Sequence, residues 1–154
     1  MQGQVKPIPE GYHTVTPYLA CDGAVKALEF YKQAFGAVVV ASMPMPNGKI
    51  GHAEIKIGDS FIMLADESPE AGMRSPKSYG GSPVSVVLYV KDCDAVVGQA
   101  ASAGGTIARP LRDEFYGDRT ATIVDPFGHT WHIHTHIRDV SPEEMKKAMQ
   151  AASQ

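Results

Sequence analysis

The sequence lacks any long hydrophobic run, and no stretch of its 154 residues is apolar over the length needed to span a bilayer. The first nine residues also lack the apolar core of a signal peptide. We therefore expect a cytoplasmic protein with no membrane partner.

Cysteine and excess positive charge are also scarce. Cys21 and Cys93 are the only cysteines, and they lack the spacing of a zinc knuckle. Two such residues do not indicate a disulfide framework, so we expect reduced thiols. The formal net charge is −3 and no basic run occurs, which disfavours nucleic acid as a partner. A small-molecule ligand remains.

Four of the six histidines are concentrated near the end of the chain, together with the single tryptophan. Residues 125–128, Asp-Pro-Phe-Gly, predict a tight turn, and residues 129–137 predict the strand that follows it. Because side chains alternate along a strand, one face of it carries Trp131, Ile133 and Thr135. The other face carries Thr130, His132, His134 and His136.

This polar face has two interpretations. It is either the solvated face of an ordinary antiparallel sheet, with Trp131 as a core anchor, or the wall of a binding site. Neutral imidazoles at His132 and His134 would serve as ligands for a metal, as proton-transfer groups or as hydrogen-bond partners. The strand alone does not decide between these alternatives.

The order strand, helix and three strands occurs twice. Expected strands span residues 12–20, 38–43, 50–57, 61–65, 84–90, 106–108, 119–124 and 129–137, with helices at 23–35 and after Asp92 or Asp94. Asp22 is the expected N-cap of the first helix, and Gly36 and Gly104 are the expected helix ends. A polar loop is expected at residues 109–118.

The two copies align at an offset of 69 residues, which places Thr16 on Ser85 and Met63 on His132. The sequence therefore predicts an α+β fold of two tandem βαβββ modules. We expect the first module at residues 12–66, a connecting loop at 67–83, the second module at 84–137, and a C-terminal helix at 141–151 that begins with the capping pattern Ser-Pro-Glu-Glu.

Several short motifs in this order resemble the glyoxalase/bleomycin-resistance/dioxygenase superfamily, also called vicinal oxygen chelate (VOC), and within it the PhnB-like branch. They are Pro17-Tyr18-Leu19, Phe30-Tyr31, Ala34-Phe35-Gly36, Gly51-His52-Ala53-Glu54, Phe115-Tyr116-Gly117-Asp118-Arg119 and Asp125-Pro126-Phe127-Gly128-His129-Thr130-Trp131. The resemblance implies a cup formed by curved sheets and usually completed in a homodimer.

In metal-dependent members of the superfamily, the first and last strands of each module supply His, Gln or Glu ligands to a divalent ion. The resemblance places these positions at Thr16, Met63, Ser85 and His132, of which only His132 is a good ligand. We therefore expect no cofactor and no metal at the standard positions. The alternative is a relocated Zn, Ni, Mn or Fe site that uses His132, His134, His52 and Glu54.

The expected ligand-binding residues combine these positions with aromatic and charged neighbours. Tyr116 and Arg119 have two interpretations, because they either belong to a structural turn with a surface ion pair or bind an anionic or planar ligand. The full expected set is His52, Glu54, Met63, Tyr89, Tyr116, Arg119, His132 and His134. The sequence thus favours a homodimeric VOC protein that binds a small organic molecule, with a metal-dependent isomerase, lyase or dioxygenase as the alternative.

Overall fold

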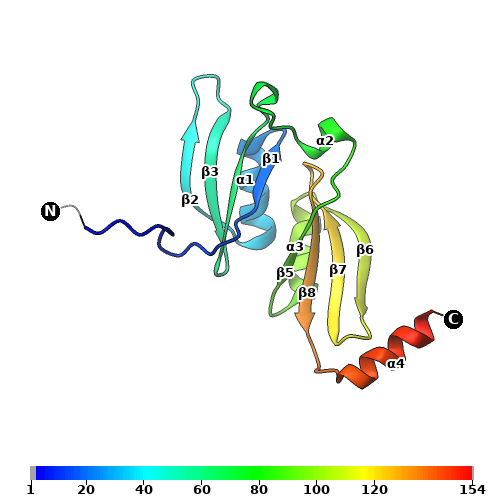
Figure 1. Cartoon of the computed structure of the whole chain (residues 1–154). Coiled ribbons are helices and arrows are strands. Elements are labelled where there is room, and N and C mark those ends of the chain that lie inside the picture. Colours follow the sequence, from blue (N-terminus) through cyan, green and yellow to red (C-terminus); the bar gives the residue numbers. More distant parts are fainter. Residues whose placement is uncertain (1–2, 154) are drawn as a thin grey trace. The chain divides into compact units, whose positions relative to one another are not determined.

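A computed structural model describes residues 3–153 (Figure 1). The chain forms two compact units, and the boundary between them along the sequence lies between Gly81 and Ser82. Each unit contains one four-stranded mixed sheet with a long helix on one face. Two tandem βαβββ modules are therefore present, which confirms the predicted α+β fold. None of the helices within residues 3–153 is long and apolar enough to cross a membrane.

The first unit contains β1 (Tyr18–Cys21), α1 (Ala24–Phe35), β2 (Val38–Pro44), β3 (Ile50–Ile57) and β4 (Ser60–Asp66). Its strand order is β1-β4-β3-β2, with β1 parallel to β4 and the other pairs antiparallel. The segment that follows holds a short 3-10 helix (Pro69–Ala71) and a single turn, α2 (Pro76–Tyr79).

The second unit contains β5 (Ser85–Tyr89), α3 (Cys93–Ala103), β6 (Thr106–Asp113), β7 (Asp118–Val124) and β8 (Thr130–His136). Its strand order, β5-β8-β7-β6, repeats that of the first unit. Outside the repeat, α4 (Pro142–Ala152) begins as predicted, because the Ser141 hydroxyl accepts a hydrogen bond from the backbone N–H of Glu144 at 3.2 Å.

Strand register shows that the two units are related copies. Tyr18 of β1 pairs with Met63 of β4, and Val87 of β5 pairs with His132 of β8. Both members of the second pair lie 69 positions after their counterparts, which is the offset predicted from the sequence. The polar and apolar rows of the two sheets can therefore be compared position by position.

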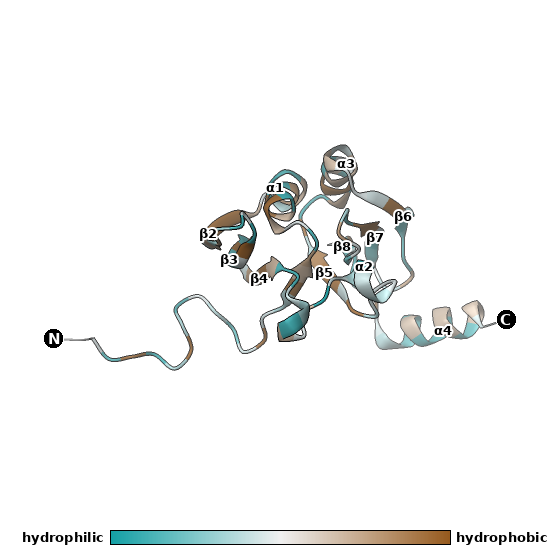
Figure 2. Ribbon diagram, turned by 90° about the horizontal axis from the view of Figure 1, so that it is seen from above, coloured by the Kyte–Doolittle hydropathy of each residue, from teal (hydrophilic) through white to brown (hydrophobic). Residues whose placement is uncertain are grey.

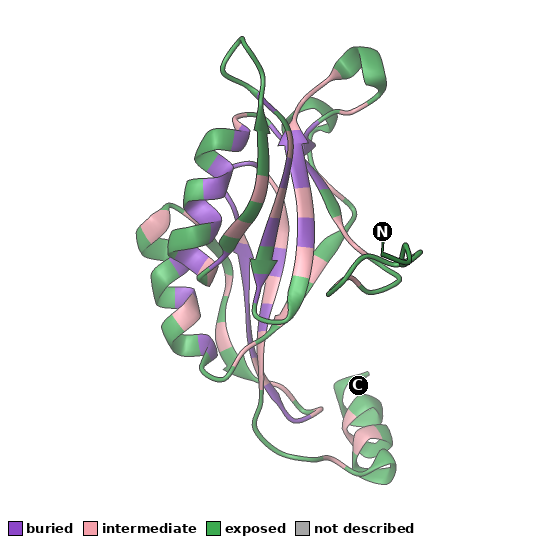
Figure 3. Cartoon of the chain, turned by 90° about the vertical axis from the view of Figure 1, so that its left-hand side faces the viewer, coloured by how far each residue is buried: buried purple, intermediate pink, exposed green. Residues whose placement is uncertain are grey.

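In each unit the core lies between the helix and one face of the sheet. Trp131 is completely buried, and Phe30 and Leu28 are also buried, which confirms their predicted core positions. Buried residues recur along one side of α1 and of α3 and on alternate positions of several strands (Figure 3). Hydrophobic residues are prominent in strands such as β2, β3 and β5 (Figure 2). The opposite face of each sheet carries both polar and apolar side chains.

The last strand of each module caps its helix through a long-range contact. Asp66 accepts hydrogen bonds from the backbone N–H groups of Gly23 and Ala24 at 3.1 and 3.0 Å. At the equivalent place, Thr135 accepts from the N–H of Cys93 at 2.9 Å. The predicted N-cap at Asp22 is therefore wrong, because Gly23 is the cap residue and Asp66 supplies the acceptor from β4.

Two strands differ from their predicted bounds by more than one residue at an end. The first starts at Tyr18 instead of residue 12, because Pro17 has no N–H and contributes only its carbonyl oxygen, which accepts from Met63 N–H at 3.0 Å. The segment from Arg109 to Asp113 belongs to β6 and is not part of a polar loop. Its proline is tolerated because β6 is an edge strand, whose pairing with β7 contains two register shifts.

Candidate functional site

The open face of the second sheet carries two facing rows of polar side chains. On β8 the row consists of His132, His134 and His136, and on β7 it consists of Thr122, Thr120 and Asp118. The pairing register places each histidine directly opposite one residue of the other row. Ala121 and Ile133, which alternate with these rows, are buried on the α3 side.

Asp118 is the centre of this array. Its side chain is nearly inaccessible to solvent, with 3% of the residue surface exposed. One carboxylate oxygen accepts from the Tyr89 hydroxyl at 2.7 Å and lies 2.9 Å from Nδ1 of His134, while the other lies 2.8 Å from Nδ1 of His136. Strands β5, β7 and β8 are thus connected through a single buried carboxylate.

This arrangement determines the protonation of the groups around Asp118. Burial alone would raise the pKa of Asp118, but hydrogen bonds from His134, His136 and Tyr89 outweigh it and hold the pKa below its ordinary value. An ionised carboxylate only accepts hydrogen bonds, so Nδ1 of His134 carries a proton and its Nε2 presents a lone pair when the ring is neutral.

His136 differs because both of its ring nitrogens face carboxylates. Its Nε2 lies 2.7 Å from Asp139, while its Nδ1 lies against Asp118. Hydrogen bonds to Asp139 and Asp118 raise the pKa of His136. The structure therefore favours a doubly protonated ring at His136, which leaves no acceptor atom for a ligand.

His132 forms a second fixed imidazole on the same face. Its Nδ1 lies 2.9 Å from the Thr122 hydroxyl. Burial, followed by the electrostatic influence of Arg109 and His134, lowers the pKa of His132, so the ring is neutral near pH 7. Within residues 3–153, Nε2 of His132 and Nε2 of His134 form no hydrogen bond, and neither is a buried atom lacking a partner, so both are open to a ligand.

Aromatic rings border the His134 imidazole. The ring of Tyr116 is nearly parallel to it, with centroids 6.3 Å apart, and the Tyr89 ring lies at 5.2 Å in a tilted orientation. Three of the predicted site residues, Tyr89, Tyr116 and His134, are therefore brought together. A planar ligand would find both aromatic surface and a hydrogen-bond acceptor here.

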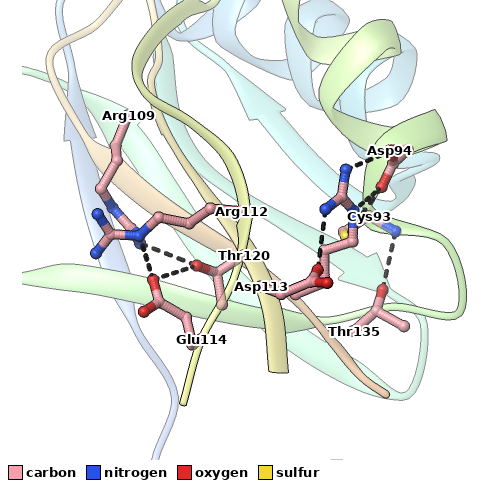
Figure 4. Close-up of polar contacts among 9 residues, drawn as sticks. Cys93, Asp94, Arg109, Arg112, Asp113, Glu114, Thr120 and Thr135 are labelled. Carbon is pink, nitrogen blue, oxygen red and sulfur yellow. Dashed lines mark hydrogen bonds and ion pairs between the residues drawn. The ribbon is translucent and has the colours of Figure 1, made fainter. Parts of the chain in front are cut away.

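A charged cluster that the sequence analysis missed lies beside these rows (Figure 4). Glu114 accepts hydrogen bonds from Arg109 at 2.5 Å, from Arg112 at 2.6 Å and from the Thr120 hydroxyl at 3.1 Å. It was missed because residues 109–118 were expected to form a loop. Strand alternation gave no signal for it, because Arg109 and Arg112 lie opposite the same row of β7, at Thr122 and Thr120, only through a register shift.

Arg119 lies apart from this group. It bonds to Asp94 of α3 and to Asp113, on the opposite side of the sheet from the cluster around Glu114 (Figure 4). The alternation of β7 explains this, because Arg119 pairs with Thr135, whose hydroxyl contacts the start of α3. Of the two interpretations of Arg119, the structure thus shows the ion pair, and we leave Arg119 out of the proposed site.

The open face of the first sheet carries a different polar row. The hydroxyl of Tyr18 lies 2.8 Å from Nδ1 of His52, whose Nε2 lies 3.4 Å from Glu54. Met63 pairs with Glu54 across β3 and β4, and Phe61 lies on the same face as Met63, two residues earlier. The predicted residues His52, Glu54 and Met63 are therefore neighbours within the first unit.

The resemblance assigns the superfamily's metal-ligand positions to Thr16 and Met63 in one unit and to Ser85 and His132 in the other. Hydroxyl and thioether groups do not replace carboxylate or imidazole around a divalent catalytic ion. In the part of the chain that the structure describes, no three His, Cys, Asp or Glu side chains form a group that could hold a metal. The standard donor set thus contains one good ligand.

The fold and the repeated register define a tandem βαβββ protein of the VOC type. Residues 12–133 match the Glyoxalase/Bleomycin resistance protein/Dioxygenase superfamily, and the chain belongs to this family. Protein Mb0911c of Mycobacterium bovis is 40% identical over 138 residues, which cover 88% of this chain and 91% of that protein. Protein At5g48480 of Arabidopsis thaliana is 30% identical over 128 residues, which cover 79% and 76%.

Solved structures share the fold at lower identity. TioX from Micromonospora sp. ML1 has a TM-score of 0.64 at 22% identity, covering 84% of this chain and 100% of TioX. The fosfomycin resistance protein FosX from Listeria monocytogenes, in complex with Mn(II) and a dihydroxypropylphosphonic acid, has a TM-score of 0.63 at 14% identity, covering 88% and 97%. At these identities the likeness concerns the fold.

Proposed function

We propose that this protein binds a small organic molecule on the open faces of its sheets, without a metal at the standard VOC positions. The observation that carries the proposal is the fixed His134 imidazole, which Asp118 holds through Nδ1 while Nε2 remains available. Tyr116 and Tyr89 supply aromatic surface beside it. A few convergent polar groups among apolar and aromatic side chains are typical of small-ligand sites.

The donor chemistry supports the metal-independent part of the proposal. Thr16, Met63 and Ser85 offer no strong ligand, and His132 alone cannot hold a catalytic ion. We also place the protein in the PhnB-like branch on the basis of its motifs. A PhnB protein from Bacillus cereus shares the fold, with a TM-score of 0.61 at 16% identity.

The ligand-binding proposal predicts metal-independent thermal stabilisation. A library of small aromatic and heteroaromatic compounds should contain ligands that raise the melting temperature, because binding to the folded state alone stabilises it. The shift should persist in the presence of a chelator. His134→Ala should weaken binding by about tenfold or more, through loss of a hydrogen bond in a desolvated site. The exposed Gln99 of α3, on the face of the second sheet opposite to His134, provides a control, and Gln99→Ala should bind normally.

A metal-dependent enzyme is the second candidate function. It is favoured by one observation, namely that the Nδ1 atoms of His132 and His134 are held by Thr122 and Asp118, as is common for metal-bound imidazoles. Stoichiometric Zn, Ni, Mn or Fe in protein purified without a histidine tag, lost in His132→Ala, would replace the binding proposal with this one.

We also propose that the protein forms a homodimer, as the resemblance implies. In support, the apolar side chains of Met145 and Met149 on α4, together with the preceding Val140, line an open groove of about 590 Å³. Met149 remains 57% exposed in the single chain. Sedimentation should give a dimer at micromolar concentration, and Met145→Lys should shift the equilibrium toward monomer. A monomeric wild-type protein would refute this arrangement.

A further inference from the structure

The N-terminal segment contacts the open face of the first sheet through one aromatic side chain. Tyr12 stacks on Phe61 of β4, with ring centroids 4.3 Å apart and an interplanar angle of 17°. The segment lies on the face of the sheet opposite to α1 (Figure 3). It therefore covers the side on which His52 and Glu54 are exposed to ligands.

Gly11 adapts the backbone to this contact. It has a φ of +82°, and a Cβ atom at this position would lie 2.9 Å from Cε2 of Phe61. A larger residue would be strained by its conformation and would also press against the Phe61 ring. The backbone before Tyr12 thus passes closely over the ring on which Tyr12 stacks.

Little else attaches the segment to the sheet. Within residues 3–16, the one backbone hydrogen bond runs from Tyr12 N–H to the carbonyl of Pro9, inside the segment itself. Val5, Ile8 and Val15 are exposed. A segment with few buried apolar contacts and few backbone hydrogen bonds opens at a low free-energy cost.

The Tyr12 hydroxyl is buried and lies near the carboxylate of Glu54. It makes no hydrogen bond of normal geometry there. Burial and the neighbouring Glu54 carboxylate raise the pKa of Tyr12 to about 12, so the phenol stays protonated. A buried hydroxyl without a well-formed hydrogen bond destabilises the folded state. The phenol of a ligand, which is not tied to the backbone, would form a better hydrogen bond at this place.

The surroundings of the Phe61 ring are suited to an aromatic compound that bears a hydroxyl group. Nζ of Lys56 lies 5.5 Å from the centroid of Phe61. Glu54 provides an acceptor near the Tyr12 hydroxyl, and Tyr18 and His52 extend the polar row. Tyr12 occupies this place with a phenol of its own.

We propose that the first sheet binds a phenol and that, in the free protein, the side chain of Tyr12 occupies the place of this ligand. Residues 9–17 form a strap over the sheet, and the phenol displaces this strap when it binds. This inference rests on the proposed function and adds the chemical class of the ligand. Because strap and ligand compete for one ring face, removal of the Tyr12 side chain should strengthen ligand binding.

The test uses 4-methylphenol, which reproduces the tyrosine side chain, and toluene, which lacks the hydroxyl. Calorimetry should show that Tyr12→Ala binds 4-methylphenol roughly 3- to 10-fold more tightly than the wild type, as expected for loss of one aromatic pair. Gly11→Ala, which retains Tyr12 but disturbs its backbone, should strengthen binding to a smaller extent. Phe61→Leu should weaken binding in the Tyr12→Ala background, and Tyr79→Ala should behave as wild type.

Proton NMR gives an independent readout, because release of Tyr12 from the Phe61 ring by 4-methylphenol should move its ring resonances toward those of a free tyrosine. Equal affinity of wild type and Tyr12→Ala would overturn the strap, and toluene binding as tightly as 4-methylphenol would overturn the phenol class. Library ligands that stabilise the protein without shifting the Tyr12 ring resonances would also overturn this inference while leaving the proposed function intact.

Discussion

Replacement of Asp118 by Asn should lower the free energy of unfolding by about 3 kcal/mol, because a buried three-way acceptor is exchanged for a group with one acceptor oxygen. Tyr89, His134 and His136 all direct polar atoms at this carboxylate, and the amide cannot serve all three. Chemical denaturation followed by circular dichroism measures the change. The same variant should lose the ligand response assigned to His134.

The pH dependence of stability should change with this substitution. The folded-state pKa of Asp118 lies below its unfolded value, so its contribution is present above an unfolded pKa of about 3.9 and is lost as the pH falls through the folded pKa. The acid limb of the stability curve should therefore be shallower in Asp118→Asn than in the wild type. His136 acts in the opposite sense, since its raised pKa adds stability that disappears as the pH rises through that value.

Asp139 offers a matched control for Asp118. It contacts the same His136 ring at 2.7 Å, but its side chain is fully exposed to solvent. Asp139→Asn should change stability by less than about 0.5 kcal/mol, as is usual for surface sites. Similar effects of the two substitutions would show that the buried carboxylate of Asp118 contributes no more to the free energy of unfolding than a surface charge.

Replacement of Trp131 by Ala should be still more destabilising, with a loss of about 4 kcal/mol or more. The indole is completely buried, and its removal leaves a large cavity between α3 and the sheet. Its Nε1–H also donates to Asp125 at 2.9 Å, and the other oxygen of that carboxylate accepts from the N–H groups of Phe127 and His129. The tryptophan therefore connects the core of β8 to the turn that precedes it.

Trp131→Phe separates these two contributions, because it retains much of the volume but removes the N–H donor. We expect a loss of about 2 kcal/mol in this variant, which is intermediate between wild type and Trp131→Ala. Denaturant unfolding should again be followed by circular dichroism, since the substitution removes the only tryptophan. A Trp131→Phe variant as stable as the wild type would exclude a contribution from the contact with Asp125.

The repeat and its faces could be predicted from the sequence because they depend on local periodicity. Alternation along β8 separated Trp131 from His132 and His134 before any partner was known. The offset that aligns Met63 with His132 also anticipated the strand register in both units. These features require only neighbours along the chain and a repeated order of elements.

The contacts that organise the site could not be predicted in the same way. Asp118 was expected at the end of a polar loop, and its role depends on the register that places it opposite His136 and within reach of Tyr89 on a third strand. The capping of α1 by Asp66 likewise joins residues more than 40 positions apart. Tyr12 was assigned to a strand because its alternation was suitable, whereas Pro17 excludes that pairing.

The irregular pairing of the outer strands bears on how the protein behaves at high concentration. Register shifts interrupt both β2 and β6, and β6 also carries Pro110 between two arginines. A flat, unprotected strand at the margin of a sheet recruits strands from other molecules, and bulges, prolines and charges prevent this. The edge strands β2 and β6 are therefore poor templates for strand addition, and we expect little aggregation through them at high protein concentration.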